Sequence, residues 1–369
     1  MDERTVEAYD RGAGDYVDKR RAYHPDRAEA FAVLLEPGEL RLDLGSGPGH
    51  YLPHLGRPVV AADAAPAMVH AALTRHGGPG VSGVVGDIET LPFARGAFAG
   101  VWASKSFQHV PAERLPLALA GLHRALAVGG VLDLTMFTGD GSEVRPADDD
   151  FPGRLFAWWQ PDALRHVLTG AGFDVEAVEV DDPSAGDVHS RMTARARRAR
   201  TLADTVGPGM RLLICGLNPS IYAADAGVGF ARSNNRFWAA ARAAGIVAVD
   251  RDPPAALRRH GVGMTDIVKR ATVAAAELTT AEYRAGLVRV EHLVRWLRPG
   301  AICFVGLAGW RAAVDRRAVA GRQPADLGGV PVYVMPSTSG LNARVPVTEL
   351  ADHLRAAAAL ADTNTVESV

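Results

Sequence analysis

Residues 212–238 read LLICGLNPSIYAADAGVGFARSNNRFW, a stretch that starts like a buried strand and ends like a helix. After the apolar run comes Gly216-Leu217-Asn218-Pro219, in which Gly permits close approach, Asn offers both a donor and an acceptor, and Pro fixes the exit. Phe230 follows in a Gly-rich turn. An amide beside an aromatic ring could hold a flat heterocycle, although a core Phe and a turn-capping Asn explain the same residues.

Similar apolar runs alternate with amphipathic stretches through both halves of the 369-residue chain. This alternation is typical of parallel sheets with crossover helices, and single domains mostly span about 100–200 residues. We therefore predict an α/β protein with two domains, residues 1–180 and 207–369, each with a mostly parallel sheet. The expected strands are LRLDLG, PVVAAD, GVVGD, AGVWAS, GVLDLTMF and FDVEAVEV in the first domain, and RLLICGL, GAICFVGL and VPVYVMP in the second.

Residues 181–206 interrupt this pattern with Pro, Gly and Ser around an Arg-rich core, and we interpret them as a linker. Five arginines in it could contact phosphates, although a solvated helix or a flexible basic tether is the favoured interpretation: Arg191, Arg195, Arg197, Arg198 and Arg200. Residues 1–204 carry a net charge of −8 and residues 205–369 a net charge of +6. This asymmetry is expected if only the second half meets a polyanion, but ordinary scatter of charge would look the same.

The two cysteines, Cys215 and Cys303, lie in apolar strand-like runs and are expected to be buried structural thiols. Two thiols cannot build a disulfide framework or a four-thiolate cluster, and no metal site is expected. The charged start MDERTVEAYD is unlike a secretion signal, and no apolar run approaches the roughly 20 residues that span a bilayer. We predict a cytoplasmic protein without a membrane partner.

The stretch LDLGSGPGHY ends an expected strand, and we expect it to open a helix. Its three glycines permit a tight turn, and the helix amides beyond it favour an anion. Asp63 follows the next strand, where a carboxylate can accept hydrogen bonds from ribose hydroxyls, and Asp87 in GDIETLPF is placed for an adenine amino group. A dinucleotide site would have its third glycine one residue later and would have no use for Asp43.

As a set, these motifs resemble the class I S-adenosylmethionine-dependent methyltransferases, in their small-molecule type 11 branch, over about residues 5–180. The resemblance implies a Rossmann-like fold and S-adenosyl-L-methionine as cofactor. The residues that it implies for cofactor binding are Asp43, Gly45, Gly47, Gly49, Asp63, Asp87 and Ile88.

The methyl acceptor is unknown. In this family the acceptor site usually borders the loop after the fourth strand, here ASKSFQHVP, so Gln108 and His109 are candidates for acceptor contacts or proton removal. A lone His in a loop is more often a packing or cofactor-contact residue. DNA base methyltransferases carry an Asn/Asp-Pro-Pro-aromatic loop or a Pro-Cys pair, and the chain has neither.

Three further segments change the interpretation of residues 212–238: GVGMTDIVKRAT, AELTTAEYRAG and VYVMPSTSGLNARVP. With GLNP and NRFW they resemble the uracil-DNA glycosylase superfamily, in its mismatch-specific uracil/thymine branch, over about residues 207–360. The resemblance implies a smaller α/β domain with a parallel central sheet that needs no cofactor. It also implies base-excision repair of double-stranded DNA that contains mismatched uracil, thymine or related lesions.

The same resemblance assigns roles to individual residues. Asn218 would hold the water that attacks the deoxyribose C1′, and Phe230 would stack on the flipped base. Backbone N–H groups near Leu217 and Phe230 would stabilise the leaving base anion, and extrusion costs least for a mispaired base. Ser220 stands where the family usually has Gly, which places a side chain near the base pocket.

The loop PSTSGLNAR would enter the duplex, with Leu341 filling the hole left by the base and Arg344 reaching the opposite strand or a phosphate. Ser337, Thr338, Ser339 and Gly340 would contact phosphates. An extra residue before Arg344 departs from the family pattern, and a plain Ser/Gly turn is the alternative. Without a catalytic carboxylate in the first motif, slow turnover is expected. Two alternatives are a small-molecule methyltransferase with an inactive second domain, and a module that binds lesions without cleaving them.

Overall fold

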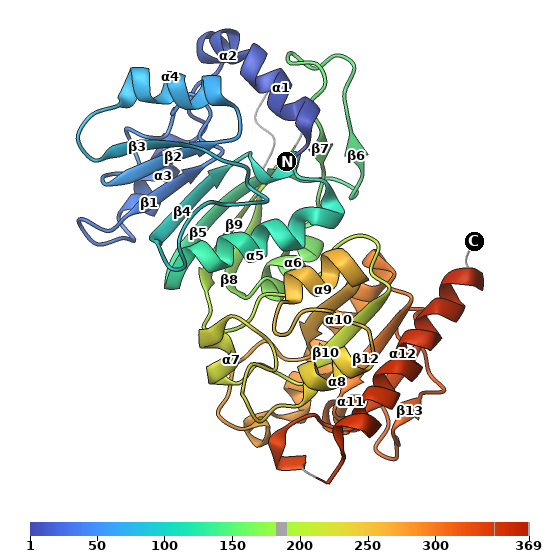
Figure 1. Cartoon of the computed structure of the whole chain (residues 1–369). Coiled ribbons are helices and arrows are strands. Elements are labelled where there is room, and N and C mark those ends of the chain that lie inside the picture. The colour runs from blue at the N-terminus through green and yellow to red at the C-terminus, as the bar shows by residue number, and fades with distance from the viewer. Residues whose placement is uncertain (182–189, 343, 368–369) are drawn as a thin grey trace. The chain divides into compact units, whose positions relative to one another are not determined.

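The computed structural model describes residues 1–181, 190–342 and 344–367, which form two compact units (Figure 1). Unit 1 comprises Met1–Thr169 and Phe173–Ala199, and unit 2 comprises Gly170–Gly172 and Arg200–Val369. Each unit has its own mostly parallel sheet with helices packed on it, so the predicted α/β class with two domains is confirmed.

Unit 1 is built on a seven-stranded sheet in the order β3-β2-β1-β4-β5-β9-β8. Its strands are β1 (Arg41–Leu44), β2 (Val59–Asp63), β3 (Val81–Val85), β4 (Phe98–Ser104), β5 (Leu126–Phe137), β8 (Phe173–Asp181) and β9 (Arg191–Arg198). The first five pair in parallel, and β9 runs antiparallel to both β5 and β8. β1 and β2 are buried along their whole length. β2 is accordingly apolar up to Asp63, whereas β1 also buries the charged residues Arg41 and Asp43.

The helices of unit 1 are α1 (Glu3–Arg11), α2 (Ala13–Lys19), α3 (Pro25–Ala32), α4 (Pro66–His76), α5 (Leu115–Ala125) and α6 (Pro161–Gly170). Short elements complete it: β6 (Glu143–Val144), β7 (Phe156–Ala157), η1 (Phe107–His109) and η2 (Ala112–Arg114). α4 shows how local sequence sets a helix. It begins at Pro66, whose fixed φ suits the first helical position, and its last turn carries Arg75, whose positive charge suits a helix C-terminus.

The Arg-rich linker is the main error of the sequence interpretation. The sequence RMTARARR is β9, an inner strand in which Met192, Ala194 and Ala196 are buried and the arginines alternate with them. Arg195 pairs with the buried Asp133 of β5 at 2.8 Å. The period of two was the signal of a strand, and the density of charge concealed it. Residues 200–206 belong to unit 2, whereas residues 182–189 of the expected linker lie outside the described residues.

Unit 2 has a five-stranded sheet in the order β11-β10-β12-β14-β13, parallel except for β13. Its strands are β10 (Leu212–Gly216), β11 (Val262–Asp266), β12 (Ala301–Val305), β13 (Gly321–Arg322) and β14 (Val332–Met335). Its helices are α7 (Ile221–Ala226), α8 (Phe237–Ala243), α9 (Pro253–His260), α10 (Thr280–Leu297), α11 (Leu307–Ala313), α12 (Val347–Glu367), η3 (Ala275–Glu277) and η4 (Gly340–Asn342). The expected strands in RLLICGL, GAICFVGL and VPVYVMP are confirmed, whereas β11 was not expected.

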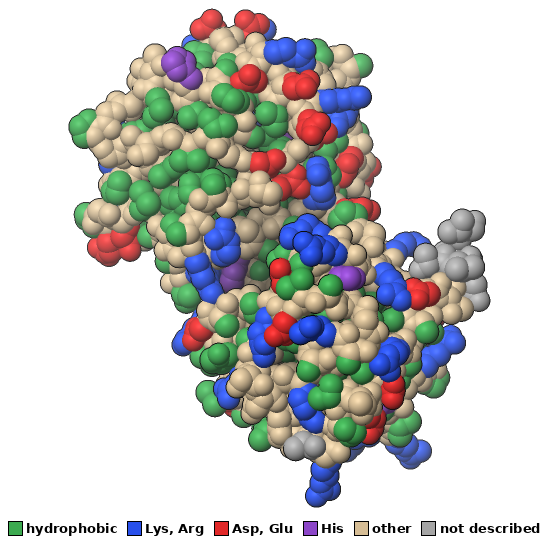
Figure 2. Space-filling model, in the orientation of Figure 1, with side chains coloured by type: hydrophobic (Ala, Val, Ile, Leu, Met, Phe, Trp, Pro, Cys, Tyr) green, Lys and Arg blue, Asp and Glu red, His purple; other side chains and the backbone are tan. Residues whose placement is uncertain are grey.

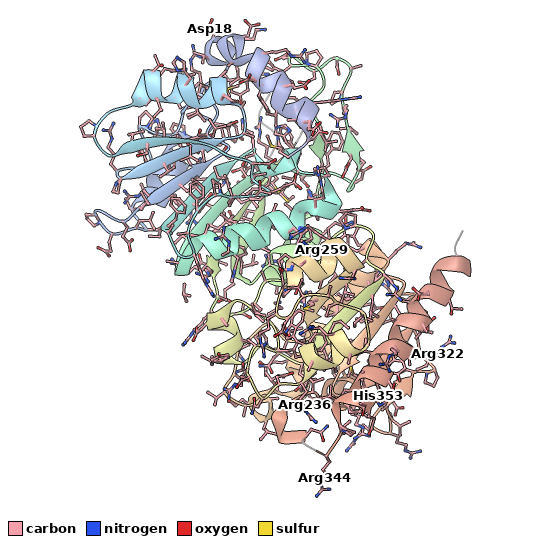
Figure 3. The ribbon with its side chains drawn as sticks, viewed as in Figure 1. Asp18, Arg236, Arg259, Arg322, Arg344 and His353 are labelled. Atoms are coloured by element: carbon pink, nitrogen blue, oxygen red, sulfur yellow. The ribbon has the colours of Figure 1, made fainter. Side chains whose placement is uncertain are left out.

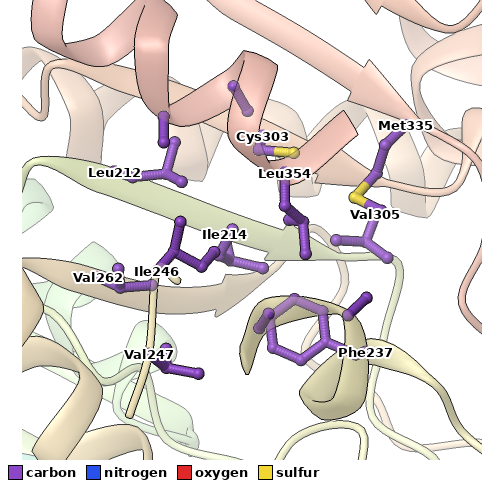
Figure 4. Close-up of a cluster of buried hydrophobic side chains, with 14 of the residues drawn as sticks. Leu212, Ile214, Phe237, Ile246, Val247, Val262, Cys303, Val305, Met335 and Leu354 are labelled. Atoms are coloured by element: carbon purple, nitrogen blue, oxygen red, sulfur yellow. The ribbon is translucent and has the colours of Figure 1, made fainter. Parts of the chain in front are cut away.

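The core of unit 2 joins side chains from distant parts of the sequence (Figure 4). Ile214 of β10, Phe237 of α8 and Leu354 of α12 are buried together, and Cys303 lies in the same cluster as a free thiol. Cys215 is also buried and free, so both cysteines are the buried thiols that were predicted. In the described ranges, no helix is long and apolar enough to cross a membrane.

Candidate functional site

The glycine-rich loop after β1 needs its glycines for shape. Gly45, Gly47 and Gly49 all have positive φ, at 71°, 51° and 78°, a region that favours glycine. A Cβ on Gly45 would collide with the side chain of Ser106, so this backbone lies directly against the end of β4. The expected helix after the loop is wrong: residues 47–54 form successive turns, in which the amides of Leu52 and His54 bond to carbonyls three residues earlier.

Two buried carboxyl groups lie behind this loop. Asp63 ends β2, and its carboxylate accepts from the amides of Gly47 and Ala65, both at 2.9 Å. Asp43 lies in β1, and its Oδ2 is buried without a hydrogen-bond partner among the described residues. Burial and the charge of Asp63 raise the pKa of Asp43 to about 8, and burial also raises the pKa of Asp63. Both groups therefore favour a ligand that brings hydrogen-bond donors or positive charge.

A cavity beside the loop collects most of the predicted cofactor residues. Gly45, Gly47, Asp63 and Ile88 line it, together with residues of α1 and α2 that the sequence did not reveal: Tyr9 and Tyr16. Asp87 lies at its border, where its Oδ1 accepts from the amide of Glu89 at 2.9 Å, and Asp43 and Gly49 are placed behind the lining. Tyr9 and Tyr16 sit in amphipathic helices whose apolar residues could have identified them as inward-facing.

Gln108 and His109 lie together in η1, but in different environments. His109 is fully bonded: Nδ1 donates to the carbonyl of Leu155 at 2.6 Å, and Nε2 accepts from the hydroxyl of Tyr9 at 2.7 Å. Burial lowers the pKa of His109 to about 4, so its ring stays neutral. Gln108 is 3% exposed, and its Oε1 has no partner in the described part of the chain. Gln108 is thus the better placed of the two for contact with an acceptor.

In unit 2, Asn218 lies directly after β10 with its side chain fixed. Its Nδ2 donates to the carbonyl of Arg270 at 2.9 Å and to the hydroxyl of Thr272 at 2.8 Å. These partners lie in the segment after β11, which the parallel pairing of β10 and β11 brings alongside. Because the amide nitrogen is committed to them, the Oδ1 of Asn218 is the atom left to accept a hydrogen bond from a ligand or water.

Phe230 lies next to this strand end. It has a positive φ of 56°, which is unusual for a bulky residue and typical of functional sites, and its ring stacks on that of Phe237 at 4.2 Å. The indole of Trp238 supports the preceding turn by donating to the carbonyl of Gly229 at 2.9 Å. A Cβ on Gly216 would lie 3.6 Å from the Phe230 ring, so β10 and the ring meet closely.

Asp266 is a pocket residue to which the sequence analysis gave no role. It ends β11, its Oδ1 lies against Gly216, and it lines a small cavity together with Phe230 and Thr265. Burial raises the pKa of Asp266 to about 6, although Lys269 opposes the shift. Its place at the carboxyl end of a strand, where such sheets bind ligands, was the available signal.

Leu217 and Ser220 both lie near this pocket. Leu217 contacts the backbone around Gly306 and Gly309, so its side chain packs inward, while its carbonyl accepts from the amide of Val268 at 2.9 Å. Ser220 caps α7, because its hydroxyl accepts from the amide of Ala223 at 3.1 Å. The hydroxyl of Ser220 thus has a local structural role.

Arg236 makes several hydrogen bonds to the loop that contains residues 337–342 and 344. Its guanidinium donates to the carbonyls of Asn342 at 2.6 Å and Ser339 at 3.3 Å, and its own amide donates to Thr338. Leu341 is 99% exposed, which is unusual for a large apolar side chain. Arg344 extends away from the fold, whereas Arg236 lies against it (Figure 3).

The other residues of this loop are buried or hydrogen-bonded at its base. Thr338 is 1% exposed, Ser337 accepts from the amide of Ser339 at 3.3 Å, and a Cβ on Gly340 would approach the side chain of Asn234. The loop therefore has a rigid base beneath an exposed apolar tip. Many Lys and Arg side chains lie on the visible face of unit 2 (Figure 2).

Comparison with known proteins finds two families. A model of the methyltransferase domain matches residues 42–133, and a model of the uracil DNA glycosylase superfamily matches residues 203–359.

Solved structures that are similar to this chain cover about half of it. They include the putative methyltransferase from the Haloferax volcanii complex with the Trm112 methyltransferase activator, at 20% identity and a TM-score of 0.43, covering 53% of this chain and 96% of that one. The 1,6-didemethyltoxoflavin-N1-methyltransferase of Burkholderia thailandensis has 22% identity and a TM-score of 0.42, covering 53% and 85%. A DhpI–SAH complex has 26% identity and a TM-score of 0.41, covering 53% and 96%.

The residues that match the methyltransferase model lie within unit 1, and those that match the uracil DNA glycosylase model lie within unit 2. The chain therefore joins a methyltransferase domain to a domain of the uracil DNA glycosylase superfamily.

Proposed function

We propose that unit 2 is a monofunctional, mismatch-type uracil-DNA glycosylase that acts in base-excision repair. The observation that carries this proposal is the fixed amide of Asn218, whose nitrogen bonds to Arg270 and Thr272 and whose Oδ1 is left to accept from water. A water held there would attack C1′ as the N-glycosidic bond breaks, and the base would leave as an anion stabilised by nearby backbone N–H groups.

The remaining features of unit 2 support the same proposal. Phe230 offers a ring for stacking, and stacking of a base on an aromatic side chain is worth about 1–3 kcal/mol. The exposed Leu341 is suited to replacing the extruded base in the helix, and Arg344 to a phosphate contact. Extrusion costs least at mispaired bases, so duplexes with G·U and G·T pairs are the proposed substrates.

The test is cleavage of duplexes that carry G·U, G·T, A·U or ethenocytosine, each treated with alkali after incubation. We expect nicking of at least the G·U strand, and loss of it in Asn218→Ala. Asn364→Ala is the matched control, because Asn364 lies in α12 and donates to the carbonyl of Gly300. Equal nicking by the Asn218 variant would reject the mechanism, and binding without nicking by the wild type would favour a lesion-binding module. Rising salt should weaken binding if the contacts are to phosphates.

For unit 1 we propose S-adenosyl-L-methionine-dependent methylation of a small molecule. The residues fit this cofactor: the left-handed glycine loop allows close backbone approach, the carboxylate of Asp63 lines the cavity, and the Oδ2 of Asp43 is buried without a partner among the described residues. When bound, the cofactor supplies a methyl group on a sulfonium. Asp63 would orient the ribose, Asp87 and Ile88 would hold the adenine, and Asp43 would accept from the amino acid end.

The cavity beside the loop has a volume of about 60 Å³, whereas small-ligand pockets span about 300 Å³ or more. We therefore propose that the segment with Tyr9 and Tyr16 moves when the cofactor binds. Titration calorimetry with S-adenosylhomocysteine should show binding, and hydrogen exchange in α1 and α2 should change on saturation while that in α6 stays constant. If no heat of binding is detected, the proposal for unit 1 is rejected.

A further inference from the structure

A second and larger cavity of unit 1 has a volume of about 550 Å³, which is the size class of small-molecule sites. It shares Tyr9, Tyr16 and Lys105 with the cavity beside the glycine loop, so the two spaces adjoin. Ligands in the two cavities would therefore be neighbours.

Aromatic side chains form much of the wall of this larger cavity. Phe137, Phe156 and Trp158 line it, and the rings of Phe137 and Phe156 lie 5.9 Å apart with an interplanar angle of 40°. The guanidinium of Arg191 lies over Phe137 at 5.9 Å and over Tyr23 at 4.0 Å. Faces of this kind favour a flat ring over a bulky aliphatic group.

Gln108 supplies a buried, uncharged polar group in this wall. It is 3% exposed, lines the cavity, and has an Oε1 without a hydrogen-bond partner among the described residues. A buried acceptor that is left unpaired is costly, and a ligand with an N–H or O–H group would satisfy it. The hydroxyl of Tyr9 cannot serve instead, because it already donates to His109 and accepts from Arg154 at 2.9 Å.

The charges around the cavity are of both signs. Four cations and three carboxylates line it, and two pairs neutralise each other: Arg154 with Asp149, and Arg20 with Asp150. A site for a polyanion would instead gather one sign of charge. The mixture of charges in this cavity favours a small uncharged ligand over a polyanion.

We infer that this cavity binds a small planar aromatic molecule that donates an N–H or O–H hydrogen bond to the Oε1 of Gln108. That this molecule is the methyl acceptor rests on the function proposed for unit 1. The binding itself does not depend on the cofactor.

The test compares three probes of similar size: 2-naphthol is flat and has a donor, 2-methoxynaphthalene is flat without one, and 2-decalol has a donor but is not flat. Dissociation constants on the full chain are measured by ligand-observed NMR. We expect 2-naphthol to bind about tenfold more tightly than 2-methoxynaphthalene, since it makes one more buried hydrogen bond, and 2-decalol to bind most weakly.

Three variants test which side chains cause the difference in affinity between the two naphthalenes. Gln108→Leu should bring the ratio between the two naphthalenes close to one, whereas Gln160→Leu, the same change at an exposed residue before α6, should leave it unchanged. Trp158→Leu should weaken both naphthalenes several-fold without changing their ratio. Tighter binding of 2-decalol, a ratio that survives Gln108→Leu, or no binding of any probe would overturn the inference.

A titration of the same preparations with S-adenosylhomocysteine separates the two proposals. Binding of S-adenosylhomocysteine without any probe binding rejects only the aromatic site. Probe binding without S-adenosylhomocysteine binding rejects only the function proposed for unit 1.

Discussion

Both candidate sites lie where parallel strands end, yet their polar groups are of opposite kinds. In unit 1, Asp43 and Asp63 are carboxyl groups buried behind a glycine loop, and burial raises the pKa of both. In unit 2, Asn218 is a neutral amide whose nitrogen is fixed by two hydrogen bonds beside the aromatic ring of Phe230. The same strand-end geometry thus serves one site in which two carboxyl groups are buried behind a glycine loop, and one in which an oriented amide lies near a buried carboxyl group, Asp266.

The largest expected effect concerns the free-energy cost of burying the carboxyl group of Asp43. Its pKa of about 8 lies above the ordinary value of 3.8, so the native state binds more protons than the unfolded state between these values, and stability falls as pH rises through this window. Asp43→Asn should match the wild type near pH 4 and be more stable by roughly 5 kcal/mol at pH 8. Hydrogen exchange of β1 peptides, corrected for intrinsic rates, measures the difference. A constant difference across pH would contradict the assignment.

The next effect concerns Phe230, the proposed stacking surface for the base in unit 2. Phe230→Ala should reduce the single-turnover rate on a G·U duplex by about 100-fold, because it removes the stacking surface for the base. Phe230→Leu keeps an apolar contact with Phe237 and separates loss of stacking from loss of packing. If Phe230→Leu cleaves like the wild type, Phe230 is a core residue only.

A smaller effect is expected at Asp63. Asp63→Asn keeps the shape but removes the charge, and should weaken S-adenosylhomocysteine binding by about 30-fold, since hydrogen bonds to a charged group contribute about 1.5–3 kcal/mol. Calorimetry on the variant and on Asp162→Asn, an exposed control in α6, gives the comparison. Equal affinities for all three proteins would remove Asp63 from the cofactor site.

The sequence predicted the parts of the molecule that follow from periodicity and local chemistry. Apolar runs identified β2, β10, β12 and β14, and glycines identified the left-handed loop after β1. It could not reveal β9, where charge concealed the alternation around Met192 and Ala194. Nor could it reveal the orphan oxygen of Gln108 or the convergence of Asp266 with Phe230, because both depend on side chains brought together by tertiary packing.

The smallest effect concerns the exposed tip of unit 2. Leu341→Ala should leave the unfolding midpoint unchanged, because the side chain is 99% exposed. It should reduce cleavage of A·U more than of G·U, about fivefold against twofold, since a paired base costs more to extrude. Val319→Ala, at another exposed apolar residue, is the control. Equal losses on both duplexes would show that Leu341 is not a wedge.

The central claim is that Asn218 acts on the water and not on the binding of DNA. The direct measurement pairs the single-turnover rate on a G·U duplex with the dissociation constant for the same duplex, for the wild type and Asn218→Ala. We predict a fall of at least about 100-fold in rate, as for the loss of other oriented catalytic groups, with the dissociation constant changed less than about twofold. An undiminished rate, or a loss of binding that accounts for the whole loss of rate, would contradict the claim.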